Sequence, residues 1–120
     1  MFIDTHAHLY GEEFDADRDD VIRRARAAGA EQIVLPNVDE ASIEPMLRLC
    51  DAYPDLCLPT MGLQPEELPA DPRPLLDKME QLLATGRYAA VGEVGVDLYW
   101  DTGRREEQLA VFDREIRWAV

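Results

Sequence analysis

Short apolar runs alternate with longer amphipathic segments along the whole chain. The apolar runs predict strands at 1–6, 32–35, within 56–62 and at 88–94. The amphipathic segments, in which apolar residues recur every three or four positions, predict helices at about 17–28, from 42, after 72 and from 104 onward. Four strand–helix units in succession predict an α/β fold with a parallel sheet and right-handed crossovers. Either a doubly wound sheet or a barrel satisfies this pattern.

Residues at the predicted helix ends sharpen these boundaries. Asp17 can cap the start of the first helix, and Gly29 can end it. Ser42 is a better start for the second helix than Asp39, because Pro45 then falls in the first turn, where its missing N–H costs little. One face of the last helix is apolar and is expected to be buried; it carries Leu109, Phe112, Ile116 and Ala119.

Composition places the chain among globular proteins and argues against one class of function. The chain has 120 residues, 47% of them hydrophobic, which is enough for one domain, 1–120, with a core of its own. Its 25 acidic and 12 basic residues give a formal net charge of -13, whereas a general nucleic-acid binder carries a basic patch. A polyanionic substrate would need metal cations between itself and this protein. We interpret the charge itself as favouring solubility.

The cysteines and the lack of targeting signals suggest a cellular location. Cys50 and Cys57 have no zinc-site spacing, so two free, buried thiols in a reducing compartment are expected. The sequence has neither the pattern of a signal peptide nor an apolar stretch of the ~18 residues that a membrane span needs. We therefore expect a cytoplasmic protein without a membrane partner.

Polar or glycine-rich sequence follows each predicted strand. The four strand ends read DTHAH (4–8), PN (36–37), GLQPE (62–66) and GEVGVD (92–97). The carboxyl ends of parallel strands meet at one edge of the sheet, where the chemistry of such folds is found. The candidate functional residues should therefore lie together at this edge.

The first strand end carries both histidines of the chain. Residues two apart in an extended segment point to the same face, so Asp4, His6 and His8 should project together. Imidazole is a common metal ligand, and a carboxylate such as that of Asp4 can orient it through its second ring nitrogen. The pattern favours a metal site that needs further ligands from elsewhere. The alternative is a pair of ordinary polar residues where a strand becomes a loop.

The fourth strand end supplies the best candidate for a further ligand. Glu93 follows an otherwise apolar strand, where a buried carboxylate is costly unless it is paired or bound to a metal. Such a carboxylate can bridge two cations in a site that activates water. The alternative is a structural hydrogen bond to a loop. Asp97, Tyr99 and Trp100 could line a substrate cleft or pack over the sheet.

The three motifs DTHAHL, GLQPEEL and GEVGVDLYW, in this order and spacing, resemble the TatD family of metal-dependent deoxyribonucleases. The resemblance implies the first four βα units of a (β/α)8 TIM barrel and one or two divalent cations, magnesium, manganese or zinc. It implies that His6, His8 and Glu93 are metal ligands, with Glu93 also catalytic as the bridging carboxylate. The implied activity is hydrolysis of DNA phosphodiester bonds by metal-activated water, in the manner of a 3′–5′ exonuclease.

The motif at the end of the third predicted strand, GLQPE (62–66), departs from the family pattern of glycine, a hydrophobic residue, histidine, proline and histidine. Here Gln64 and Glu66 replace the two histidines. Gln64 can donate a hydrogen bond to substrate but carries no charge, and Glu66 would repel a phosphate. The substitutions leave room for an amidohydrolase-type barrel that acts on a lactone, an amide or a phosphotriester.

The end of the sequence leaves the completeness of the domain open. The chain stops at Val120, within the predicted fourth helix, and a barrel of this type needs ~250 residues. We expect the N-terminal half of a longer enzyme, which would be inactive alone. The alternatives are half-barrels that associate through their open sheet edges and a non-catalytic half-barrel.

Overall fold

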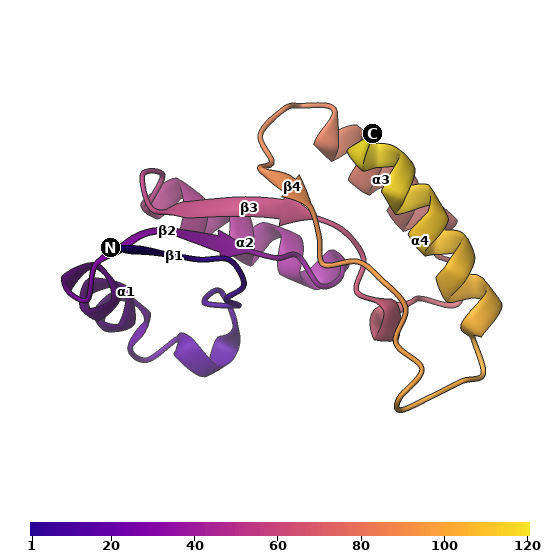
Figure 1. The fold of residues 1–120 in the computed structure, drawn as a ribbon, viewed down its shortest axis with the longest axis horizontal. Helices are drawn as coiled ribbons and strands as arrows, with labels where there is room; N and C mark the ends of the chain where they lie inside the picture. The colour runs from indigo at the N-terminus through magenta and orange to yellow at the C-terminus, as the bar shows by residue number, and fades with distance from the viewer.

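Four parallel strands form one sheet in the order in which they occur along the chain (Figure 1). The computed structural model describes residues 1–120. The strands are β1 (Phe2–Asp4), β2 (Ala30–Leu35), β3 (Cys57–Met61) and β4 (Ala90–Val91). In a doubly wound sheet the strand order reverses at a switch point, whereas a barrel keeps the sequential order. The order β1-β2-β3-β4 therefore makes this chain a half-barrel, as predicted.

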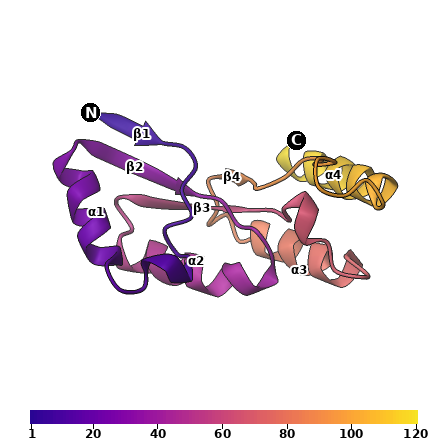
Figure 2. The ribbon, with the colours of Figure 1, turned by 90° about the horizontal axis from the view of Figure 1, so that it is seen from below.

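Each strand is followed by a helix. The helices are α1 (Arg18–Ala27), α2 (Glu40–Ala52), α3 (Arg73–Leu83) and α4 (Arg105–Ala119), with short 3-10 turns η1 (Glu12–Phe14) and η2 (Pro65–Glu67) in the loops. Figure 2 shows α1, α2 and α3 along one side of the strands. The core between these helices and the sheet is aliphatic and sulfur-rich. Cys50 and Cys57 lie in this core as free thiols, as expected.

No helix in the structure has both the length and the apolar character needed to cross a lipid bilayer.

The fourth strand is shorter than predicted. Only Ala90 and Val91 form the strand, although the apolar run suggested 88–94. The Gly92 N–H still bonds to Met61 of β3, but the Glu93 N–H donates to the Asn37 carbonyl beyond β2, at 2.9 Å. The backbone thus leaves the β3 ladder after Gly92 and crosses the end of the sheet.

The start of α2 also differs from the prediction. Asp39, not Ser42, is the N-cap residue: its carboxylate accepts a hydrogen bond from the Ser42 N–H at 2.9 Å, and the Ser42 hydroxyl accepts one from the Asp39 N–H at 3.1 Å. This reciprocal capping box places Pro45 inside the helix. For α1, Asp17 is the N-cap residue as predicted, although its side chain makes no capping hydrogen bond, and Gly29 follows the helix with a φ of 100°.

The predicted orientation of α4 was wrong. Leu109 and Ile116 on the apolar stripe are 36% and 47% exposed, and the face toward the sheet instead carries Gln108, Val111 and Glu115. The Gln108 amide bonds to both backbone groups of Asp97, at 2.8 and 2.9 Å. Hydrogen bonds to loop backbone therefore decide which face turns inward. The exposed apolar stripe is a surface that a following unit covers in a closed barrel.

Glu115 is a buried carboxyl group with half of its hydrogen-bonding capacity unused. The side chain is 1% exposed. One oxygen accepts a hydrogen bond from the Leu63 N–H at 2.7 Å, and the other has no partner. Burial raises the pKa of Glu115 to about 7, although the Leu63 N–H acts in the opposite direction.

This pKa makes the stability of the protein depend on pH. Because folding raises the pKa of Glu115 from 4.5 to about 7, the folded state binds the proton more tightly. Stability is therefore lost as pH rises through this interval, by ~3 kcal/mol in all.

We expect Glu115→Gln to unfold like the parent near pH 4.5 and to be more stable above pH 7, in urea titrations across this range. Glu106→Gln, at an exposed position of the same helix, should follow the parent curve. Parallel curves for the parent and Glu115→Gln would contradict the assignment.

Candidate metal centre

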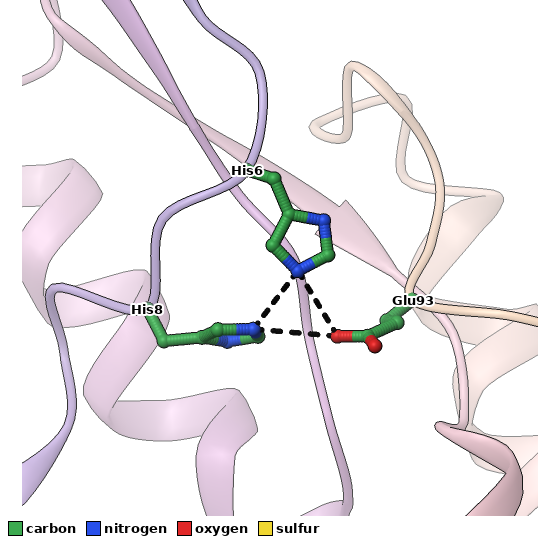
Figure 3. A group of neighbouring side chains, drawn as sticks. All are labelled: His6, His8 and Glu93. Atoms are coloured by element: carbon green, nitrogen blue, oxygen red, sulfur yellow. Dashed lines mark hydrogen bonds and ion pairs between the residues drawn. The ribbon is translucent and has the colours of Figure 1, made fainter. Parts of the chain in front are cut away.

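His6, His8 and Glu93 converge at the carboxyl edge of the sheet (Figure 3). The histidines come from the loop after β1, and the glutamate comes from the segment after β4. The two Nε2 atoms are 3.0 Å apart, and a Glu93 carboxylate oxygen lies 3.4 Å from that of His6 and 3.3 Å from that of His8. The predicted juxtaposition of the first and fourth strand ends is therefore present.

The spacing of these atoms fits a divalent cation. At an ion–ligand distance of ~2.1 Å, neighbouring ligands are ~3.0 Å apart in octahedral and ~3.4 Å apart in tetrahedral coordination. The three observed separations, 3.0, 3.3 and 3.4 Å, lie in this interval. Two imidazoles and a carboxylate suit zinc or manganese, and a carboxylate with open positions also suits magnesium. The three side chains can hold a cation, and their role as ligands stays a prediction.

The loop after β1 is held in an extended form that gives both histidines the same direction. The Ala7 N–H donates to the Val34 carbonyl of β2 at 3.1 Å, so the chain follows β2 past the end of β1. His6 and His8, on either side of Ala7, therefore share one face. The Asp4 carboxylate was expected to orient an imidazole. Instead it accepts a hydrogen bond from the His6 backbone N–H at 3.1 Å.

The partner of the second ring nitrogen of His8 is Tyr10. The Nδ1 atom lies 2.9 Å from the Tyr10 hydroxyl, which donates to the Pro36 carbonyl at 2.5 Å. Burial raises the pKa of Tyr10 to about 12, so the hydroxyl keeps its proton at neutral pH. Sequence reasoning missed this residue. The signal was the continued alternation: His6, His8 and Tyr10 are spaced two apart.

Asn37 was also missed as a member of the site's framework. This fully buried residue follows β2, and its carbonyl accepts the hydrogen bond from the Glu93 N–H. Its side-chain amide donates to the carbonyls of Gly62 at 2.9 Å and Asp39 at 3.0 Å, and its side-chain oxygen accepts from the Ser42 hydroxyl at 2.7 Å. Asn37 thus ties the ends of β2 and β3 and the start of α2 to the backbone of Glu93.

Glu93 is less buried than its apolar sequence context suggested. Its side chain is 28% exposed. The two histidines are the only basic side chains within ion-pair distance of it. The carboxylate therefore faces an open edge of the sheet and is not neutralised by lysine or arginine, which leaves it free to bind a cation.

The three residues proposed to contact substrate lie outside this cluster. The Gln64 side-chain oxygen caps η2 by accepting from the Glu66 N–H at 2.7 Å. Tyr99 is 81% exposed and contacts the Trp100 ring edge-on. The Asp97 carboxylate accepts from the Tyr99 N–H at 3.0 Å. These contacts are local, and a role in substrate binding stays a prediction for all three.

Glu66 and Asp97 form a pair of interacting carboxyl groups beside Gln64. The hydrogen bond between them raises the pKa of Glu66. The Tyr99 N–H, followed by the hydrogen bond to Glu66, holds the pKa of Asp97 below its ordinary value. This part of the carboxyl edge is therefore anionic, at the positions of the motif where Gln64 and Glu66 replace histidines.

Comparisons with known proteins agree on one family. The family model described as "TatD related DNase" matches residues 3–120. The chain is 33% identical over 119 residues to the uncharacterized metal-dependent hydrolase YabD of Bacillus subtilis, covering 99% of this chain and 46% of YabD. It is 26% identical over 117 residues to the 3′-5′ ssDNA/RNA exonuclease TatD of Pectobacterium carotovorum, covering 98% of this chain and 45% of the relative.

A solved structure gives the same result for the fold. The crystal structure of YjjV, a TatD homolog from Escherichia coli, matches with a TM-score of 0.88 at 30% identity, over 98% of this chain and 46% of that chain. The chain thus spans about half the length of the relatives that it matches.

Proposed function

Because the chain belongs to the family of TatD-related DNases, we propose that it carries the first part of the active centre of a divalent-metal-dependent hydrolase that cleaves phosphodiester bonds in DNA. The observation that supports this most directly is the triangle of ligand atoms from His6, His8 and Glu93, whose separations suit a cation. A bound divalent cation would polarise a phosphoryl oxygen and lower the pKa of a bound water.

The residues of this chain have distinct parts in the proposed site. His6 and His8 supply neutral nitrogen ligands from a loop that β2 holds extended. Glu93 supplies negative charge, and its two carboxylate oxygens allow it to bridge two cations. The hydrogen bond from the Glu93 N–H to Asn37 fixes the position of this carboxylate at the edge of the sheet. The remaining ligands and the general base would come from outside these residues.

Single-stranded DNA cleaved from its 3′ end is the substrate we propose, on the strength of the Pectobacterium relative, whose name states a 3′-5′ ssDNA/RNA exonuclease. The formal net charge of -13 fits such a substrate only if cations mediate its binding. A strict dependence of both binding and cleavage on divalent metal is therefore part of the proposal.

A second candidate function is supported by the acidic pair Glu66–Asp97. Glu66 stands where the family motif carries a histidine, Asp97 interacts with it, and both carboxyl groups would repel a phosphodiester. An uncharged substrate, such as a lactone, an amide or a phosphotriester, would not meet this repulsion. The same metal ligands serve either reaction.

One assay separates the two candidates. The whole protein that contains this chain, loaded in turn with Mg²⁺, Mn²⁺ and Zn²⁺, is offered 5′-labelled single-stranded DNA and a panel of lactones and phosphotriesters. We expect stepwise loss of 3′ nucleotides that stops when a chelator is added. Turnover of a lactone or a phosphotriester beside intact DNA would replace the first candidate with the second. No turnover of any substrate with any of the metals would contradict both.

A further inference from the structure

Tyr10 connects the candidate metal centre to the end of β2. The residue is buried, and its ring stands edge-on to that of His8, with 5.8 Å between ring centroids and an interplanar angle of 84°. Its hydroxyl oxygen lies 2.9 Å from Nδ1 of His8 and 2.5 Å from the carbonyl oxygen of Pro36. The side chain thus joins a predicted metal ligand to a backbone carbonyl through two short contacts.

The number of hydrogens available at each atom determines which atom is the donor in the two contacts of the Tyr10 hydroxyl. Two oxygen atoms 2.5 Å apart need a hydrogen between them, and the Pro36 carbonyl has none to give. The hydrogen is therefore that of the Tyr10 hydroxyl. A hydroxyl has a single hydrogen, so the same oxygen can only accept from His8. The donor at 2.9 Å is then the Nδ1–H of His8.

This assignment determines which nitrogen of His8 is free to bind a metal. A neutral imidazole carries one proton, and with that proton on Nδ1 the lone pair is on Nε2. Nε2 is the atom that faces Nε2 of His6 at 3.0 Å and the Glu93 carboxylate at 3.3 Å. The hydroxyl therefore presents the lone pair to the side of the ring where the other two ligand atoms lie.

We propose that Tyr10 is a positioning residue, whose hydroxyl, by donating to the Pro36 carbonyl, holds His8 in the Nδ1–H tautomer and directs its Nε2 lone pair into the metal centre. The inference rests on the metal site of the proposed function and adds to it the group that prepares one ligand before a cation arrives. Pre-setting the tautomer removes a proton rearrangement from metal binding, and partners of this kind typically change metal affinity 10–100-fold.

Tyr53 provides a matched control for the test. Its hydroxyl also makes a short hydrogen bond, to the Asp19 carboxylate of α1 at 2.6 Å, but Tyr53, at the end of α2, has no hydrogen bond or ring contact with either histidine. Tyr10→Phe and Tyr53→Phe each remove one hydroxyl and keep the ring. Only the first should affect His8.

The tautomer can be read directly in the metal-free protein. Long-range ¹H–¹⁵N correlation spectra distinguish the two neutral tautomers from each other and from the imidazolium, and His6→Ala assigns the two histidines of the chain. We expect Nδ1–H for His8 in the parent and in Tyr53→Phe, and a gain of Nε2–H in Tyr10→Phe. Competition with a chelator should then give a Zn²⁺ affinity about tenfold lower for Tyr10→Phe alone.

Two results would overturn the proposal: an Nε2–H tautomer for His8 in the parent protein, or an unchanged tautomer and Zn²⁺ affinity in Tyr10→Phe. The parent spectrum decides the question even if the variant folds poorly. Because the tautomer is read without metal or substrate, a protein that fails to cleave DNA leaves this result standing. The two proposals therefore fail separately.

Discussion

Changing His6 and His8 together to alanine is expected to leave the protein without tightly bound divalent metal and without metal-dependent hydrolysis. The two Nε2 atoms form one 3.0 Å side of the triangle, so the variant retains only the Glu93 carboxylate of the three ligands. Loss of a partner that merely orients a ligand costs 10–100-fold in metal affinity, so loss of a ligand itself should cost at least ~100-fold for each histidine. Elemental analysis after dialysis, together with Zn²⁺ titration calorimetry, measures the effect.

The same variant should keep its fold. His6 is exposed and His8 is half-buried, and neither belongs to the aliphatic core. Thermal unfolding of the metal-free proteins serves as the control, with Gln81→Ala, an exposed change on α3, as the matched substitution. Metal content that equals that of the parent would refute both histidines as ligands. A metal loss that coincides with unfolding in the metal-free state would instead place the histidines in the framework of the fold.

The sequence was sufficient to predict the juxtaposition of the candidate ligands. Parallel strands that follow one another along the chain bring their carboxyl ends to one edge, so polar residues after β1 and after β4 must lie near each other once the sheet curves. His6 and Glu93 are 87 positions apart, yet their side chains approach to 3.4 Å. The alternation of apolar and polar residues predicts the strands and helices, and their order predicts the parallel sheet. Both concern regular backbone, so together they predict that these strand ends meet.

The partners of the ligands could not be predicted in the same way. Asp4 has the right chemistry to orient an imidazole, but its carboxylate reaches the His6 backbone N–H. The group that contacts His8 is Tyr10, and its position depends on the carbonyl of Pro36, 26 residues further along the chain. Such a contact depends on the path of the irregular backbone in the loops. The spacing of hydrophobic residues along the sequence does not predict that path.

The inward face of α4 was missed for a related reason. An amphipathic pattern shows which face of a helix is apolar, but it does not show which neighbour covers that face. In this helix the apolar stripe with Leu109 and Ile116 is exposed, while Gln108 and Glu115 bond to loop backbone at the end of the sheet. The side chain–backbone hydrogen bonds of this inward face are not visible in the apolar pattern, so that pattern alone predicted the wrong face.

Glu93→Gln is expected to reduce metal-dependent hydrolysis by the whole protein at least ~100-fold. Losing a residue that only orients a ligand costs about 10–100-fold in metal affinity, so weakening a ligand itself should cost at least as much. The substitution keeps the size of the side chain and the backbone hydrogen bond to Asn37, so it removes only the negative charge and one ligand oxygen. A neutral amide binds divalent cations more weakly than a carboxylate. It also has no negative charge with which to hold two cations together. The loss should therefore appear as weaker Mn²⁺ or Zn²⁺ binding in calorimetry and as a lower rate at saturating metal.

Glu66→Gln is the matched control, because it makes the same chemical change at the neighbouring strand end, outside the triangle of ligand atoms. Its metal affinity should equal that of the parent. Glu93→Asp keeps the negative charge but shortens the side chain by one methylene. It should retain more activity than Glu93→Gln, because cation binding depends more on the charge of the ligand than on the length of its side chain. Equal losses in Glu93→Gln and Glu66→Gln would mean that the acidity of the whole edge matters and that Glu93 has no special place in it. Full activity in Glu93→Gln would remove this carboxylate from the proposed centre.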